Sequence, residues 1–174
     1  MARARLPWIK FLATWGVFLL LHFSYETFPN VVFKVIGEEG ETTFFHMKML
    51  FFAYLFASIV EFLVRRRGLA SVGQFISSRM LVAVVYPWLA ITLWFTAQAL
   101  GIHVPVIPWE IVYANVCTAI GIYAALRLEE VLDAARFRPS LHALVGMVFA
   151  AALVSYVAFS FATPADFFTT PPEF

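Results

Sequence analysis

Residues 22–48, HFSYETFPNVVFKVIGEEGETTFFHMK, join two long apolar segments and decide how the rest of the chain is interpreted. They hold two of the four histidines and four of the eleven acidic residues of a 174-residue chain that is 62% hydrophobic. Ionisable side chains are therefore concentrated where one apolar segment ends and the next begins. A functional site, if the sequence carries one, is expected here.

The composition of the whole chain is that of a membrane protein. Only 13% of the residues are charged, whereas soluble domains carry about 25%. A helix that crosses a hydrocarbon core of about 30 Å needs about 20 mainly apolar residues. Five segments meet this requirement: 7–29, 44–64, 80–100, 108–127 and 141–163. We therefore expect an all-α fold, a single transmembrane domain over residues 1–174 with five spanning helices.

The arginines predict the orientation of this domain. Lys and Arg in short loops are held on the cytoplasmic side of a membrane. In a five-span topology all of the arginines fall on one side: Arg3, Arg5, Arg65, Arg66, Arg67, Arg79, Arg127, Arg136 and Arg138. This pattern predicts a protein of the cytoplasmic (cell inner) membrane, with its N-terminus inside and its C-terminus outside. The net charge of +1 gives no indication of nucleic-acid binding.

Several polar residues fall at the outer end of the predicted bundle. His22 and Glu26 are four residues apart and share a helical face. His46 shares a face with Ala53 and Ala57, and small residues mark packed faces in membrane bundles. Ionisable groups inside spans are functional candidates by default. We expect an outward-facing polar pocket with these candidate residues: His22, Tyr25, Glu26, Glu41, His46 and Glu110.

This set of residues suits more than one chemistry. His22, Glu26, His46 and Glu41 supply the imidazole and carboxylate ligands that a divalent metal such as zinc or iron accepts. Haem held by the two histidines is another alternative, as is proton binding by His46, since histidine titrates near neutral pH. In the structural alternative, the histidines satisfy each other inside the bundle and the glutamates meet water. The sequence leaves these alternatives open.

Other charged residues have simpler interpretations. Glu61 lies one turn before Arg65, which predicts a solvated ion pair at the inner membrane interface. Lys48 is predicted to point away from His46 and to extend its long side chain to the headgroups. Residues 65–79 predict a short basic loop, and Pro87 predicts a kink in the third span. The single cysteine, Cys117, excludes an intrachain disulfide.

Two segments carry a family resemblance: LHFSYETFP (21–29) and GETTFFHMKMLFF (40–52). They resemble a family of uncharacterised small multi-pass membrane proteins from bacteria and archaea. In that family the first span ends in His-Phe-x-Tyr, and the second opens with Asn-Glu-Ser, three residues, then His-x-Lys. The tail TPADFFTTPPEF (163–174) is similar to the Pro-rich aromatic tail of that family. The resemblance singles out His22, Phe23, Tyr25, Glu41, His46 and Lys48.

This chain departs from the family pattern at three positions. Gly40 replaces Asn, Thr42 replaces Ser, and Phe45 replaces a second acidic residue. The resemblance therefore implies no mechanism that needs that Asn or two carboxylates. It also brings no known activity with it.

Three functions fit the sequence. The leading hypothesis is a binding or accessory membrane protein whose pocket takes an ion, a proton or a small amphipathic ligand. The second is an intramembrane enzyme that acts on a lipid or isoprenoid through a His–Glu pair or a metal. The third is an assembly subunit of a membrane complex or a homo-oligomer. The sequence assigns no catalytic residue.

Overall fold

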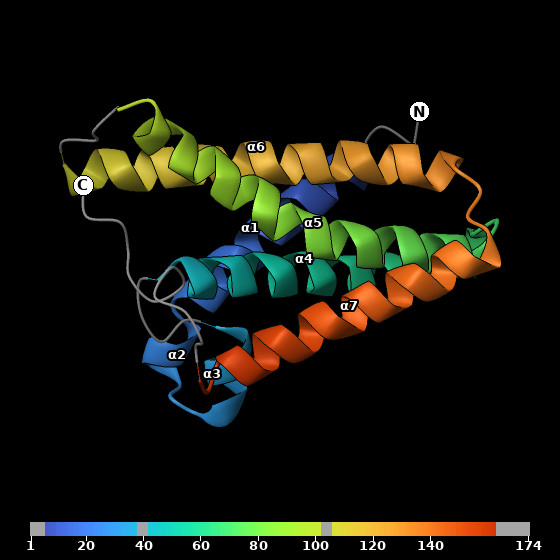
Figure 1. Ribbon diagram of the computed structural model, residues 1–174, viewed down its shortest axis with the longest axis horizontal. Coiled ribbons are helices and arrows are strands. Elements are labelled where there is room, and N and C mark those ends of the chain that lie inside the picture. Colours follow the sequence, from blue (N-terminus) through green and yellow to red (C-terminus); the bar gives the residue numbers. More distant parts are fainter. Residues whose placement is uncertain (1–5, 38–41, 102–105, 163–174) are drawn as a thin grey trace.

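The fold is all-α in the residues that the computed structural model describes, 6–37, 42–101 and 106–162 (Figure 1). Three helices come first: α1 (Leu6–His22), α2 (Ser24–Thr27) and α3 (Val31–Ile36). They are followed by α4 (Thr43–Arg65), a 3₁₀ turn η2 (Arg66–Gly68), α5 (Val72–Ala99), α6 (Ile107–Ala134) and α7 (Pro139–Phe159). Among these, α4, α5, α6 and α7 are long and apolar enough to cross a membrane, and α1 is a shorter apolar helix. These lengths and hydropathies are those of a multi-pass membrane protein.

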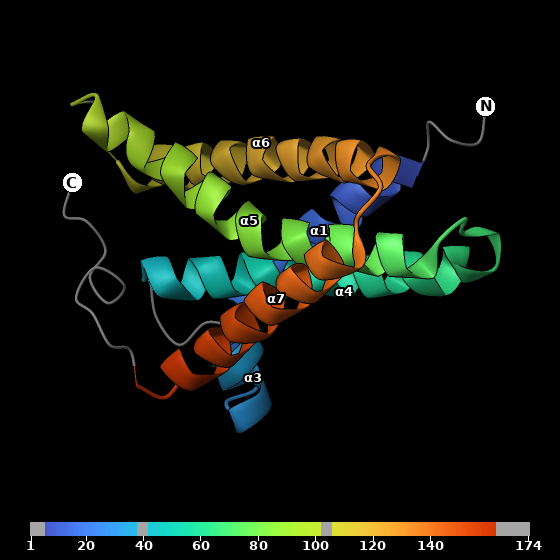
Figure 2. The ribbon, with the colours of Figure 1, turned by 45° about the vertical axis from the view of Figure 1, so that its right-hand side comes forward.

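The long helices run back and forth along one axis of the molecule (Figures 1 and 2). α1 packs on α4, while α5 packs against α4, α6 and α7. α4 is the most enclosed helix, and Met49, Phe51 and Tyr54 on it are completely buried. α7 crosses the bundle obliquely and is the most exposed of the four long helices in the described part of the chain. An exposed apolar helix suits a lipid environment, where no hydrophobic penalty arises.

The first apolar segment is interrupted earlier than the predicted range 7–29. α1 ends at His22, and α2 starts two residues later. The hydroxyl of Ser24 donates a hydrogen bond to the carbonyl of Leu21 at 2.8 Å. Side-chain bonds of this kind compete for the carbonyls of a helix and bend it. Glu26 therefore does not continue the helical face of His22 as the i,i+4 spacing predicted.

α5 begins eight residues before the predicted start of the third span at residue 80. Its first turns are polar, but they are held by the last turn of α6 and by the segment that joins α6 to α7. The Gln74 amide donates to the Leu132 carbonyl at 2.7 Å and accepts from the Phe137 N–H at 3.1 Å. Most of the predicted 65–79 loop is therefore helix. α5 also changes direction along its length in Figures 1 and 2, as Pro87 predicted.

Gly37 lets the α2–α3 segment pack against the end of α1. A Cβ atom at this position would lie 2.9 Å from the Phe33 carbonyl oxygen and 3.0 Å from that of Leu21. It would also meet the Ser24 hydroxyl at 2.2 Å. Two of these three neighbours are backbone atoms, so a side chain at position 37 cannot be accommodated by a rotamer change.

We expect Gly37→Ala to destabilise the protein by about 1–3 kcal/mol, the usual cost of overpacking a closed contact. Gly146→Ala is the matched control, because a Cβ there meets nothing within 4 Å. In a helix, that change should be neutral or stabilising by about 0.5–1 kcal/mol. Denaturant titration of the purified variants in detergent measures both changes, and equal stability of the two variants would contradict the close packing at Gly37.

Candidate functional site

The structure brings two of the predicted site residues together, His22 at the end of α1 and His46 in the first turn of α4. Their ring centroids lie 5.7 Å apart. The Nδ1 atom of His46 lies 2.9 Å from the Thr42 carbonyl oxygen. A carbonyl only accepts, so Nδ1 carries the hydrogen and the lone pair of neutral His46 is on Nε2. This is a tautomer in which histidine accepts a proton or binds a metal.

Three of the other predicted site residues lie on α2 or α6, and the fourth lies outside the described residues. Tyr25 is half-buried and Glu26 is exposed on α2. Glu110 is half-buried in the first turn of α6, whose start lies across the bundle from α2 and α3 in Figures 1 and 2. Glu41 lies outside the described residues. Within residues 6–37, 42–101 and 106–162 no group of three or more His, Cys, Asp or Glu could hold a metal ion. The four-ligand metal site, which includes Glu41, stays a prediction.

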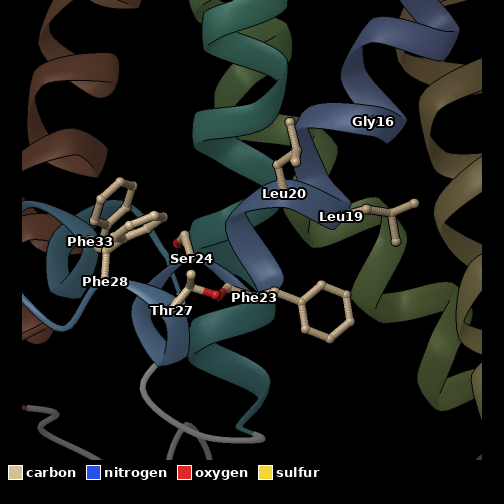
Figure 3. Close-up of a pocket in the computed structure, with 8 residues that line it drawn as sticks. All are labelled: Gly16, Leu19, Leu20, Phe23, Ser24, Thr27, Phe28 and Phe33. Atoms are coloured by element: carbon tan, nitrogen blue, oxygen red, sulfur yellow. The ribbon is translucent and has the colours of Figure 1, made fainter.

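An apolar groove of about 750 Å³ runs along α1 (Figure 3). Figure 3 shows Phe28 and Phe33 on one side of it and Phe23 on the other, with Ser24 and Thr27 between them. Gly16, Leu19 and Leu20 complete the lining. The Phe23 ring meets the His22 ring edge-on, with the centroids 4.9 Å apart. The groove and the histidine pair are thus joined through Phe23.

Lys48 is completely buried, so the prediction that it reaches the headgroups is wrong. Its ammonium group donates to the Lys34 carbonyl at 2.7 Å and to the Ser160 hydroxyl at 3.1 Å. It also lies 4.5 Å from the centroid of the Phe45 ring, within the range of a cation–π interaction. The periodicity of α4 placed Lys48 opposite His46 correctly, but α3 and α7 cover that face. Lys48 therefore ties these two segments to α4.

The main charged cluster lies at the other end of the bundle, and sequence reasoning missed it. We call it the ionic network; it consists of Lys10 on α1, Glu61 on α4, Arg79 on α5, and Glu129 and Asp133 on α6. Lys10 donates to Glu61 at 2.8 Å and also to Glu129. Arg79 donates to Glu61 at 3.0 Å, lies 3.4 Å from Glu129, and donates to Asp133. Each long charged side chain therefore bridges different helices.

The network is buried, and hydroxyl groups complete its hydrogen bonds. The side chains of Lys10, Arg79, Glu61 and Glu129 are each 6–8% exposed. The Tyr54 hydroxyl donates to Glu129, and the Ser78 hydroxyl donates to Asp133 at 2.7 Å. The prediction of a solvated Glu61–Arg65 pair is thus wrong: Arg65 does bond Glu61, but as the outermost of three cations around a buried carboxylate.

One sequence signal pointed to this network. Lys10 is the fifth residue of α1, and Glu61 lies four residues before the end of α4. A charge set back from the end of an apolar helix is costly unless it has a partner. The positions of Lys10 and Glu61 inside two apolar segments were therefore informative, although they did not identify the pairs.

No family model, curated protein sequence or solved structure matches this chain. The resemblance of residues 21–29, 40–52 and 163–174 to the family of small multi-pass membrane proteins therefore stays a prediction.

Breaking the ionic network on one side should be severe. Lys10→Met leaves two buried carboxylates with one cation fewer, a change that typically costs about 3–5 kcal/mol. Arg127→Met is the matched control, since Arg127 pairs with Glu130 on the exposed surface. Loss of such a pair costs about 0–1 kcal/mol. Denaturant titration in detergent measures both variants.

Adding Glu129→Gln to Lys10→Met restores the charge balance, so the double variant should regain part of the lost stability. If Lys10→Met and Arg127→Met lowered the free energy of unfolding by similar amounts, the buried network would contribute no more to stability than an exposed ion pair.

Proposed function

We propose that this chain is a five-span protein of the cytoplasmic membrane whose outer end binds a proton, an ion or a small amphipathic ligand. The observation that carries the proposal is the His22–His46 pair, two imidazoles from different helices with ring centroids 5.7 Å apart. We infer that the N-terminus lies inside and the C-terminus outside, so that the arginine-rich end faces the cytoplasm and the histidine pair faces outward.

The dimensions of α1 support its assignment as the fifth span. At 1.5 Å per residue its 17 residues rise about 26 Å, close to the thickness of the hydrocarbon core. Trp8 and Trp109 are exposed near the starts of α1 and α6, at opposite ends of the bundle. Tryptophan favours both membrane interfaces. The η2 turn and the α6–α7 turn, which carry Arg66, Arg67, Arg136 and Arg138, lie toward the same end in Figure 1.

The site has a polar and an apolar part. Zinc–nitrogen bonds are about 2.0–2.1 Å long, so two imidazoles on one ion have centroids about 5–6 Å apart. The observed separation fits such a pair, with Nε2 of His46 as one ligand atom. The groove beyond Phe23 suits the hydrocarbon part of an amphipathic ligand, because its lining is almost entirely apolar.

The orientation can be tested with the only native thiol removed. In a Cys117→Ser background, Asn30→Cys and Arg136→Cys place thiols at exposed positions near opposite ends of the bundle. We expect a membrane-impermeant maleimide to label Asn30→Cys in intact cells, and Arg136→Cys only after the cells are opened. The reverse pattern would invert the topology and move the histidine pair to the cytoplasmic side.

The site itself is tested by zinc binding. We expect added Zn²⁺ to raise the midpoint of thermal unfolding of the purified protein, because a ligand that binds only the folded state stabilises it. The rise should disappear in a His22→Ala, His46→Ala double variant. It should persist in His142→Ala, the matched control, because His142 bonds Ser77 at the other end of the bundle.

Elemental analysis, an absorption spectrum and lipid analysis of the same samples extend the test. Near-stoichiometric metal or a haem band lost only in the double variant would favour the intramembrane enzyme over a simple binding protein. A lipid or other small molecule lost only in that variant would favour the amphipathic ligand. If zinc stabilisation, metal content and bound molecules were all the same in the two proteins, the histidine pair would have no binding role.

A further inference from the structure

Four exposed arginines form no ion pair with any residue that the structure describes, and they lie toward one end of the bundle in Figure 1. They are Arg66 and Arg67 in the η2 turn, and Arg136 and Arg138 between α6 and α7. The other described arginines each bond a carboxylate: Arg65, Arg79 and Arg127. This end of the bundle therefore presents uncompensated positive charge at its surface.

The two arginines between α6 and α7 lie on the same side of a short extended segment. Ala135 and Arg138 both have extended backbone, with φ of −73° and −75° and ψ of 153° and 157°. Successive side chains of extended backbone point to opposite sides. In agreement, Phe137 is half-buried, whereas Arg136 and Arg138 are exposed. The two guanidinium groups therefore project outward together, from Cα atoms about 7 Å apart.

Neighbouring helices hold this segment in place. The Phe137 N–H donates to the Gln74 side chain at 3.1 Å, and that side chain donates to the Leu132 carbonyl at 2.7 Å. The Phe137 ring packs against the His142 ring of α7, with the centroids 5.5 Å apart. The arginines are thus carried on a backbone fixed to α5 and α7. Such preorganisation lowers the entropy lost when both bind one ligand.

The carboxylates that precede these arginines on α6 are already bonded to other cations. Glu130 pairs with Arg127 at 2.7 Å, and Asp133 accepts from Arg79. An anion that pairs with Arg136 and Arg138 must therefore come from outside the described part of the chain. Guanidinium groups bind phosphate oxygens well, because their N–H donors match the spacing of those oxygens.

An exposed apolar face begins directly after the arginines. Leu141, Leu144 and Val148 are exposed on α7, and at this spacing they share one helical face. α6 and α7 are both long and apolar enough to cross a membrane. The segment between them then lies at the level of the headgroups, while the apolar face meets acyl chains. A phosphate attached to hydrocarbon chains fits this arrangement better than a soluble phosphate does.

We propose that Arg136 and Arg138 form a binding site for the phosphate of an anionic phospholipid, whose acyl chains lie along the exposed face of α7. The site selects a headgroup with net negative charge, such as phosphatidylglycerol, over the zwitterionic headgroup of phosphatidylcholine. It lies at the opposite end of the bundle from the histidine pair. It depends neither on the role proposed for that pair nor on the side of the membrane that the arginines face.

Lipid titration of the full chain in detergent micelles tests the proposal, with bound lipid counted by native mass spectrometry. We expect phosphatidylglycerol to bind more tightly than phosphatidylcholine with the same acyl chains. An Arg136→Gln, Arg138→Gln double variant should bind phosphatidylglycerol about 25-fold more weakly, at about fivefold for each arginine. The matched control is Arg66→Gln, Arg67→Gln, which removes the same charge from the η2 turn at the same end. Its affinity should fall much less.

Three results would overturn the proposal. Equal losses of affinity in the two double variants would mean that the arginines act only as diffuse surface charge. Equal affinity of the unchanged protein for the two lipids would remove the selectivity for an anion. Soluble glycerol 3-phosphate that bound as tightly as phosphatidylglycerol would exclude a role for the acyl chains. All four substituted side chains are exposed, so both variants should keep the midpoint of thermal unfolding in phosphatidylcholine nanodiscs, which verifies their fold.

Discussion

The structure depends on the neutralisation of buried charge at one end of the bundle. Lys10 and Arg79 lie almost completely out of water, and each is stabilised only because carboxylates from other helices reach it. An unpaired charge at such a position is strongly unfavourable. The helices α1, α4, α5 and α6 must therefore meet at this end with their charged residues at one depth. Apolar packing alone, which lipid tails can replace, imposes no such register.

The two ends of the bundle are stabilised by different kinds of interaction. At the arginine-rich end, charged groups and hydroxyls fix the positions of the helices. At the opposite end the contacts are mostly aromatic: His22 packs against Phe18 and Phe23, and Lys48 lies against the ring of Phe45. The α2–α3 segment is held there by the close contact at Gly37. The histidine pair thus lies where the polypeptide is irregular and an apolar groove adjoins it, whereas the network lies where the helices are regular.

The sequence predicted the fold class well because a membrane helix depends on local composition. The apolar lengths identified α4 and α7 to within two residues at their starts and within four at their ends. They were less accurate for α5 and α6, whose polar first or last turns are stabilised by long-range bonds such as those of Gln74. The break after His22 was missed because it depends on the Ser24 hydroxyl, a competing local bond that hydropathy does not register.

For the candidate site, the order of the predicted spans placed His22 and His46 at the same end, and helical periodicity predicted that His46 faces the bundle. The expectation that Lys48 reaches the headgroups was wrong, since α3 and α7 cover the helix face on which periodicity had correctly placed it. The prediction of a solvated pair at Glu61 was also wrong, because the nearest cation in sequence, Arg65, concealed more distant partners on α1 and α5. Pairings across 51 or 119 residues, as for Lys10, are set by the tertiary arrangement.

The position of Lys10 has a consequence for how the chain enters a membrane. Lys10 belongs to α1, which is synthesised well before α4 and α6, the helices that carry its partners Glu61 and Glu129. While the later helices are still missing, the ammonium group must stay solvated at the membrane surface, because the hydrocarbon core offers it no counterion. α1 can settle to its final depth only after α4 and α6 have been inserted. The biogenesis of this protein should therefore include a late adjustment of α1.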